Sequence, residues 1–320
     1  MHILATIAAI LAAGAVVTFI GARLIERAHP PRGRFIDIGG LRQHVVELGE
    51  THGEAPPLVL IHGAGCNLED MRLALGEALA ARHRVILIDR AGLGWSERKG
   101  RRGSSPAYQA ALLRGVLDAL AVERAVLVGH SWGGALAARF ALDYPERTAA
   151  LVLLAPPLYR LARHMTWLYT ALATPFAGWL LARTFVLPFG VLGIGPGIAS
   201  AFLPQWPPWR YLKRSAALLV LRPRPFLANA RDVADLKKNL APQIARYAAL
   251  AAPTVVMTGD CDMVVPPRQH ALAFAAAVPA AKLVVLPGIG HMLHHAAKER
   301  VIAEIEELIA NGEWRMANGE

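Results

Sequence analysis

The chain has 320 residues, of which 54% are hydrophobic and only 18% are charged, and its formal net charge is +10. A soluble domain of this size does not need so many apolar residues, so part of the surface is expected to face something other than water. The basic residues form no run interleaved with aromatics, so we expect membrane lipids and no nucleic acid as partners. Cys66 and Cys261 lack metal-binding spacing and are expected to be free thiols.

The N-terminal segment is predicted to be a membrane anchor. Residues 3–21 carry no charge, and a helix of that length about spans a hydrocarbon core of ~30 Å. Arginines follow this stretch, whereas a cleaved signal peptide would carry positive charge before it. We therefore expect residues 1–28 to form a single transmembrane helix, with the rest of the chain in the cytoplasm by the positive-inside rule.

After this segment the sequence predicts strands that alternate with helices. Residues 34–38 and 41–48 are expected to pair as a hairpin through Gly39 and Gly40. Continuous apolar runs typical of strands buried on both faces occur at 58–61, 85–88, 125–128, 151–154, 254–257 and 283–286. Helix-spaced apolar positions occur at 71–81, 107–120, 134–142, 267–277 and 297–310. The alternation predicts an α/β fold, with a mostly parallel central sheet and helices on both of its faces.

The alternation is interrupted by an insertion at residues 156–249. Between positions 164 and 209 the only charged residue is Arg183. Residues 166–182 are apolar enough for a second membrane span, but Pro175 and Gly178 interrupt them, so we prefer a helical cap (lid) over a pocket. The core is then expected to comprise residues 34–155 and 250–311, with a C-terminal tail at 312–320.

A candidate nucleophile lies in the stretch Gly-His-Ser-Trp-Gly-Gly at 129–134, between a predicted strand and a predicted helix. A serine hydroxyl is a weak nucleophile and needs a general base beside it. A sharp strand-to-helix turn lifts the hydroxyl above the sheet and requires small residues two positions before and after, which Gly129 and Gly133 provide. The amides at the start of the helix also suit developing negative charge. Ser131 is therefore the candidate nucleophile.

An acid and a histidine follow in an order that a catalytic triad can use. The loops Gly-Asp-Cys-Asp at 259–262 and Gly-Ile-Gly-His at 288–291 follow the last two predicted strands. Both loops leave the carboxyl edge of the sheet, where Ser131 lies and where ligands collect in such sheets. We expect His291 to take the proton of Ser131 and an aspartate to orient the imidazole.

A glycine-rich loop, His-Gly-Ala-Gly at 62–65, follows the first parallel strand at the same edge. The backbone amides of Ala64 and Trp132 are expected to form an oxyanion hole, where one donor is worth about 3 kcal/mol of transition-state stabilisation. His62 and His130 are expected to support the oxyanion-hole loop and the turn that carries Ser131. Asp89 and Arg90 are expected to brace neighbouring loops.

Four motifs in this order resemble those of the α/β-hydrolase superfamily. They are HGAG at 62–65, DRAGLGWS at 89–96, GHSWGG at 129–134 and the paired GDCD and GIGH loops. The resemblance covers roughly residues 34–310 and implies the α/β-hydrolase fold with an inserted helical cap. The second motif looks like that of epoxide hydrolases and haloalkane dehalogenases, which use an aspartate nucleophile. Because Ser131 stands in its place, acyl transfer to water is implied instead.

The resemblance also selects between neighbouring candidates for the acid and the base. Relatives place the acid three residues after the glycine, with Val-Pro following, which favours Asp262 over Asp260. The Gly-His pattern favours His291, so His294 and His295 are expected to begin the final helix with surface or pocket-rim roles.

Together these residues predict a serine esterase or lipase-like enzyme that cleaves a carboxylic ester of a hydrophobic or lipid-like substrate through an acyl-enzyme. No cofactor and no metal are implied. The same triad also serves lactones, thioesters, amides and C–C bonds, or transfers an acyl group to a lipid alcohol. An epoxide hydrolase or dehalogenase, or a non-catalytic membrane-bound binding protein, is less favoured.

Overall fold

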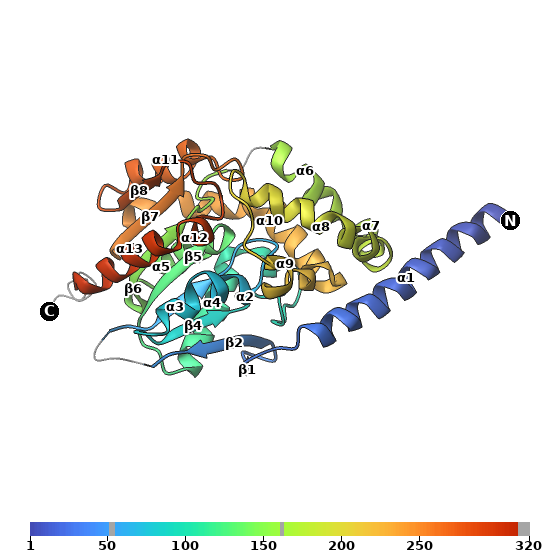
Figure 1. Ribbon diagram of the computed structural model, residues 1–320, viewed down its shortest axis with the longest axis horizontal. Coiled ribbons are helices and arrows are strands. Elements are labelled where there is room, and N and C mark those ends of the chain that lie inside the picture. The colour runs from blue at the N-terminus through green and yellow to red at the C-terminus, as the bar shows by residue number, and fades with distance from the viewer. Residues whose placement is uncertain (51–54, 161–162, 313–320) are drawn as a thin grey trace.

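The computed structural model describes residues 1–50, 55–160 and 163–312, so the expected tail lies outside the described residues from position 313 onward. One eight-stranded sheet runs through the body of the protein (Figure 1), in the order β1-β2-β4-β3-β5-β6-β7-β8. The strands are β1 Arg34–Asp37, β2 Arg42–Leu48, β3 Leu58–Ile61, β4 Val85–Ile88, β5 Ala125–His130, β6 Thr148–Leu154, β7 Thr254–Gly259 and β8 Lys282–Leu286. All pairings from β4 to β8 are parallel, which confirms the predicted mostly parallel sheet.

The hairpin of β1 and β2 supplies the antiparallel edge of the sheet. Gly39 and Gly40 form its turn with φ of 62° and 81°, and the amides of Ile38 and Leu41 each donate to the other's carbonyl. Two successive positive φ angles are the conformation of a tight hairpin turn, and glycine adopts them without steric cost.

Helices cover both faces of the sheet because its inner strands are apolar on both sides. Val126 and Leu127 are adjacent in β5 and fully buried, yet they belong to opposite hydrophobic clusters, as the two-residue period of a strand requires. Burying such a side chain is worth roughly 1.5–3 kcal/mol. One cluster contains residues of α4 Pro106–Ala119, α5 Trp132–Asp143 and α11 Ala271–Ala277. The other contains residues of α2 Leu68–Met71, a π-helical turn Arg72–Gly76, α3 Glu77–Leu79, α12 Leu293–Ala296 and α13 Lys298–Ala310.

The helices inserted between β6 and β7 lie beside one end of the sheet (Figure 1). They are α6 Arg163–Leu172, α7 Pro175–Thr184, α8 Val186–Phe202, α9 Tyr211–Arg214 and α10 Pro223–Ile244. The segment that suggested a second membrane span is divided, since α6 ends before Pro175 and Thr174 caps α7 by accepting the Gly178 amide at 3.3 Å. A break then separates α7 from α8, whose axes are bent by 80°.

The N-terminal helix α1 spans His2–Ala28 and projects beyond the cap (Figure 1). Its apolar window has a mean hydropathy of 2.5 and is only 6% buried. Within the described residues, α1 is the only individual helix that is long and apolar enough to cross a membrane. The helices α7 and α8 reach the required length and hydropathy only if the bent pair is counted as one span.

Candidate active site

Ser131 occupies a strained turn between β5 and α5. Its φ of 51° and ψ of −123° are unusual for a residue with a side chain, and such strain clusters at functional sites. A Cβ on Gly129 would lie 2.4 Å from the carbonyl oxygen of Gly133, and a Cβ on Gly133 would lie 2.3 Å from that of Ile61. The crowding around the turn therefore requires both glycines.

The structure brings His291 and Asp262 together at the carboxyl edge of the sheet. His291 Nδ1 lies 2.8 Å from Asp262 Oδ2, and both side chains are almost fully buried. The other carboxylate oxygen accepts the amides of Val264 and Val265, each at 2.8 Å. An imidazole that donates through Nδ1 keeps Nε2 available as a proton acceptor. Asp260, the rejected alternative, instead accepts the Gly288 amide at 2.7 Å and stabilises its loop.

Ser131, Trp132 and His291 line one cavity of about 460 Å³. Most of its lining is apolar and comes from the cap, including Ile194 and Ile198 of α8. Within the described residues, the Ser131 hydroxyl makes no hydrogen bond, so nucleophile and base share the cavity without that contact. In ligand-free enzymes such hydrogen bonds are often long and tighten when substrate binds.

The two expected oxyanion-hole residues, Ala64 and Trp132, line the same cavity. Trp132 is the first residue of α5, and a helix offers no internal carbonyl to the amide at this position. Beside Ala64, the Gly65 amide is held by Asn229 of the cap at 2.6 Å. Both candidate residues therefore border the cavity that contains Ser131.

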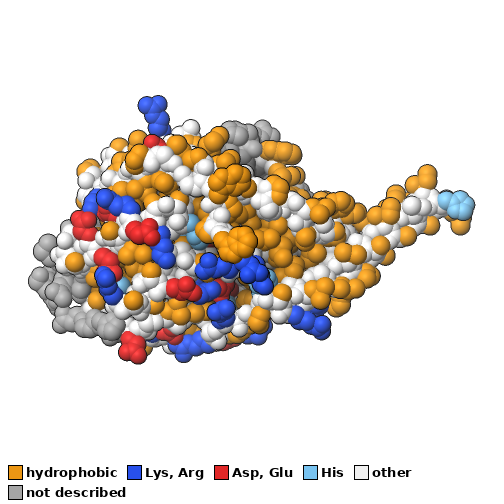
Figure 2. Space-filling view, in the orientation of Figure 1, with side chains coloured by type: hydrophobic (Ala, Val, Ile, Leu, Met, Phe, Trp, Pro, Cys, Tyr) orange, Lys and Arg blue, Asp and Glu red, His pale blue; other side chains and the backbone are white. Residues whose placement is uncertain are grey.

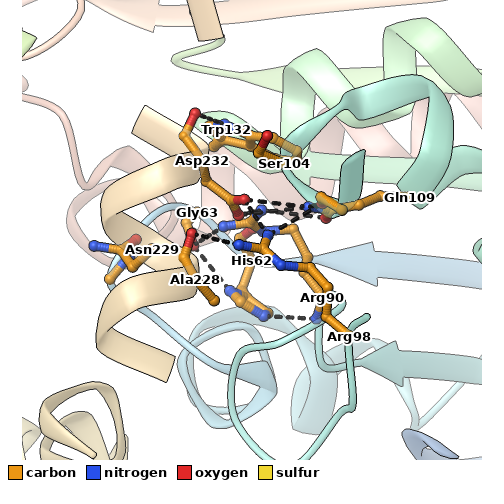
Figure 3. Close-up of polar contacts among 12 residues, drawn as sticks. His62, Gly63, Arg90, Arg98, Ser104, Gln109, Trp132, Ala228, Asn229 and Asp232 are labelled. Atoms are coloured by element: carbon orange, nitrogen blue, oxygen red, sulfur yellow. Dashed lines mark hydrogen bonds and ion pairs between the residues drawn. The ribbon is translucent and has the colours of Figure 1, made fainter. Parts of the chain in front are cut away.

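A buried ion-pair network joins the cap to this turn (Figure 3). Asp232 of α10 is fully buried and accepts hydrogen bonds from Arg98 and, at 2.8 Å, from Arg90. The Arg90 guanidinium lies 4.0 Å from the centroid of the Trp132 ring, and the Trp132 indole N–H donates to the Asp232 carbonyl at 3.1 Å. Arg90 thus has the supporting role that the sequence suggested for it.

A second polar cluster, the Asp70 cluster, lies beside the candidate triad. Asp70 is 1% exposed and accepts hydrogen bonds from His294 Nε2 at 3.0 Å, His295 Nε2 at 2.8 Å and the Tyr211 hydroxyl at 2.6 Å. The ring of His130 lies between the two groups, 4.0 Å from the His294 ring and 4.9 Å from the His291 ring between centroids.

This cluster overturns the expected surface or pocket-rim roles of His294 and His295. Both lie in the short helix α12, which turns them inward toward α2, and neither lines the cavity. Asp70 and Tyr211 were missed because neither belongs to a recognisable motif. Only the tertiary packing of α2, α9 and α12 brings them together with the histidines.

Burial and mutual contact determine the charges in the Asp70 cluster. Burial alone would raise the pKa of Asp70, but the charge of His294 and the hydrogen bonds from both imidazoles outweigh it and hold this pKa well below its ordinary value. Burial lowers the pKa of His294 to about 4. Among the described residues, Asp70, His294 and His295 are the side chains that could share a metal ion, since their ligand atoms lie within 4.8 Å of one another. Each imidazole contacts the carboxylate through Nε2, while Nδ1 of His294 is buried without a hydrogen-bond partner among the described residues.

The two cysteines are free thiols, as expected. Cys66 lines the cavity, whereas Cys261 is exposed in the loop that carries Asp262.

Comparison with known proteins identifies the relatives of the chain. Residues 56–297 match the family model described as the alpha/beta hydrolase fold. The chain is 28% identical to a 2-hydroxy-6-oxononadienedioate/2-hydroxy-6-oxononatrienedioate hydrolase of Comamonas testosteroni, over 87% of this chain and 96% of that one. It is 26% identical to a 2-hydroxy-6-oxo-6-phenylhexa-2,4-dienoate hydrolase of Burkholderia cepacia, over 90% of this chain and 100% of that one. Among solved structures it is similar to a thermophilic esterase from Thermogutta terrifontis, with a TM-score of 0.71 and 25% identity over 88% of this chain and 99% of that one.

Proposed function

Because the chain belongs to the alpha/beta hydrolase fold family, we propose that it is a serine hydrolase with Ser131, His291 and Asp262 as its catalytic triad. One observation carries the proposal: His291 is oriented by Asp262 through Nδ1 and borders the same cavity as Ser131. This arrangement leaves His291 Nε2 as the proton acceptor.

The proposed reaction needs no group beyond these residues and water. Ser131 Oγ attacks the carbonyl carbon of the substrate while His291 Nε2 takes its proton, and Asp262 stabilises the imidazolium. The amides of Ala64 and Trp132 stabilise the oxyanion. The leaving group departs with the proton from His291, and a water molecule activated by His291 then hydrolyses the acyl-enzyme and regenerates Ser131.

The first candidate for the scissile bond is a carbon–carbon bond beside a ketone, rather than the carboxylic ester expected from the sequence. The names of the two relatives describe substrates with carboxylate, enol and keto groups and no ester or amide. Hydrolysis of such a compound breaks a C–C bond next to the keto carbon. In this case His291 delivers its proton to the leaving carbon.

Ester or lactone cleavage is the second candidate, and the cavity lining favours it. Within the described residues, no lysine or arginine lines the cavity, and its only carboxylate is Asp70. A buried substrate carboxylate without a cation would be costly, so an uncharged substrate is favoured over a dienoate anion. The similarity to the Thermogutta esterase agrees with this alternative.

The test compares two substrate series with purified wild type and Ser131→Ala. One series is p-nitrophenyl esters of graded chain length, and the other is 2-hydroxy-6-oxo-6-phenylhexa-2,4-dienoate together with the uncharged diketone 1-phenyl-1,3-butanedione. Ketone cleavage would establish the first candidate and ester cleavage alone the second. Ser131→Ala is expected to lower kcat by about 10⁴-fold or more on either series. Activity that survives this substitution would exclude the triad.

We also propose that α1 anchors the protein, with the catalytic body on the cytoplasmic side. At 27 residues, α1 is long enough for the hydrocarbon core, since a helix rises about 1.5 Å per residue. Arg23 and Arg27 follow its apolar part. A C-terminal fluorescent-protein fusion should stay with carbonate-washed membranes and fluoresce inside the cell. Extraction by carbonate would rule out the anchor, and a fusion on the outer side would reverse the orientation.

A further inference from the structure

The N-terminal helix packs closely against the junction of α7 and α8. A Cβ on Gly14 would lie 2.6 Å from the Thr184 carbonyl oxygen, and a Cβ on Gly21 would lie 2.7 Å from the Leu187 side chain. Between these glycines, Thr18 is 2% exposed and its hydroxyl donates to the Thr184 carbonyl at 3.4 Å. Residues 14, 18 and 21 share one helix face, and small residues of this kind let membrane helices approach closely.

This contact determines how deep the cap must lie if α1 spans a bilayer. Gly14 and Gly21 belong to the uncharged stretch that would fill the hydrocarbon core. Seven residues of helix separate them by about 10 Å along the axis. Thr184 and Leu187, which contact these glycines, therefore lie at hydrocarbon depth. The bent pair of helices α7 and α8 (residues 175–202), called the α7–α8 hairpin below, enters the same layer.

The exposed surface of the hairpin has the composition that this depth requires. Phe176 is 76% exposed, Phe189 66% and Leu192 77%, all on a surface that would be unfavourable in water. Figure 2 shows hydrophobic side chains dominating the end of the molecule from which α1 projects, while charged side chains gather over the rest. The one charged residue in these two helices, Arg183, has its guanidinium 4.4 Å from the centroid of the Trp179 ring.

Aromatic and basic residues near the end of α8 mark the expected level of the head groups. Trp206 and Trp209 are 85% and 82% exposed just after α8, and tryptophan is enriched at membrane–water interfaces. A groove of about 620 Å³ follows, between the end of α1 and α9. It is lined by five basic residues, Arg32, Arg72, Arg210, Lys213 and Arg214, and by three acidic ones, Glu69, Glu77 and Asp89. Arg32 and Arg72 form ion pairs with Glu69, whereas Arg210, Lys213 and Arg214 form no ion pair with the described residues. These three free basic side chains attract anionic lipid phosphates.

Helix α8 separates this surface from the catalytic cavity. Ile194, Ile198 and Ala201 line the cavity, while Phe189 and Leu192 of the same helix face outward. Gly193, between these two sets of residues, is exposed, and an added Cβ there would meet no atom within 4 Å.

From these observations we propose that the α7–α8 hairpin is embedded in the membrane. It lies in the leaflet that faces the catalytic body of the protein. The bilayer, with anionic head groups over the basic groove, is the partner of this surface. The Ser131 cavity then receives an apolar substrate from the acyl-chain layer past α8. The inference rests on the proposed anchor and goes beyond it, since an anchor alone could hold the catalytic body in water.

Fluorescence quenching by lipids tests the position of the hairpin. Full-length protein with Cys66→Ala and Cys261→Ser carries a single environment-sensitive nitrobenzoxadiazole label through Leu192→Cys, Ile7→Cys or, as a control, Glu123→Cys at the exposed far end of the sheet. Vesicles contain phosphatidylcholine, phosphatidylglycerol and chain-spin-labelled lipid. Labels at positions 192 and 7 should be quenched and the label at 123 should not.

The three labels separate the failure of this inference from failure of the anchor. Quenching at position 7 with none at 192 would place the hairpin in water and overturn the inference while keeping the anchor. No quenching at position 7 would overturn both.

The supply of substrate from the lipid is tested through the nucleophile itself. Phe189→Asp combined with Leu192→Asp should slow modification of Ser131 by a vesicle-dissolved hexadecyl fluorophosphonate by about tenfold or more, since carboxylates are strongly disfavoured in the hydrocarbon layer. Modification by a water-soluble ethyl analogue should stay at the wild-type rate. Val285→Asp on the edge strand β8 is the matched control and should change neither rate. An unchanged hexadecyl rate in the double variant, or an equal slowing of both reagents, would overturn entry from the lipid.

Discussion

Two buried carboxylate–imidazole groups lie side by side in this protein, and only one of them has its imidazole in the cavity that contains Ser131. Asp262 and Asp70 are 4% and 1% exposed, and each binds at least one imidazole nitrogen within 3.0 Å. The imidazole of Asp262, His291, faces a cavity that also contains a serine on a strained turn. Asp70 and Tyr211, which donates to it, also line the cavity, but the two imidazoles of Asp70 do not.

The difference shows that an aspartate–histidine pair alone is not evidence of a triad. A hydrogen bond of the same length orients an imidazole equally well in either group. What distinguishes the catalytic candidate is the open space beside the imidazole and a nucleophile that the backbone holds at its edge. The Asp70 cluster instead fixes α2, α9 and α12 against one another.

The sharpest test of this comparison replaces each aspartate by asparagine. Asp262→Asn should lower the rate at which fluorophosphonate modifies Ser131 by about 10⁴-fold, because His291 is left in the wrong tautomer. Asp70→Asn should stay within about tenfold of wild type, as should Asp260→Asn in the same loop as Asp262. Equal losses from Asp262→Asn and Asp70→Asn would show that the two groups act as one catalytic unit.

The opposite ranking is expected for stability. Asp70→Ala removes the acceptor of three buried donors and should lower the free energy of unfolding by about 3 kcal/mol, measured by urea denaturation at pH 7.5. Asp260→Ala, which affects an exposed loop contact, should change it by about 0.5 kcal/mol or less. A small effect at Asp70 would mean that water or repacking replaces the lost acceptor.

Acid should act on the Asp70 cluster through His294. This histidine binds a proton near pH 6.5 when unfolded, but burial lowers its folded-state pKa to about 4. The unfolded state therefore binds more protons in this window, so stability is complete above pH 6.5 and falls as the pH drops toward 4. His294→Gln, which keeps a donor for Asp70, should flatten the fall by up to about 1 kcal/mol per pH unit. Identical urea midpoints for variant and wild type at pH 5 and pH 7.5 would contradict a buried neutral His294.

The two cysteines allow a comparison of thiol reactivity beside the two groups, because Cys66 lies near Asp70 and Cys261 lies in the loop of Asp262. Burial raises the pKa of the Cys66 thiol well above its ordinary value. The hydrogen bond with Asp260 also raises the pKa of the Cys261 thiol, but Cys261 is exposed to the reagent. Iodoacetamide should alkylate Cys261 roughly tenfold or more faster than Cys66, as read by peptide mass spectrometry. In denaturant the two rates should converge. A disulfide between them would leave both unreactive until reduction.

Much of the sheet could be predicted because its strands are short apolar runs buried on both faces. Ala125–His130 and Thr254–Gly259, for example, extend the predicted runs by two residues each. The pairing of Asp262 with His291 was also accessible from sequence, since parallel strands bring the loops at their carboxyl ends to one edge. The catalytic roles of these residues remain predictions.

The Asp70 cluster and the cap helices could not be predicted in the same way. Nothing local distinguishes Asp70 from a solvated helix residue, because its partners Tyr211 and His294 lie 141 and 224 positions away. In the cap, Pro196 lies inside α8, where local propensity would end the helix. The choice between ester and ketone cleavage also lay beyond the motifs, because one triad serves both bonds.

The tie between Asp232 and Arg90 restricts how the entrance can open. Separating this pair would leave a bare charge in the interior, at a cost of about 3–5 kcal/mol, so fewer than roughly one molecule in a hundred would be found detached at any moment. Helix α10 is therefore expected to stay in place when the cavity opens. Any opening of the cavity is then expected to involve the preceding helices, α6 to α8, instead of α10.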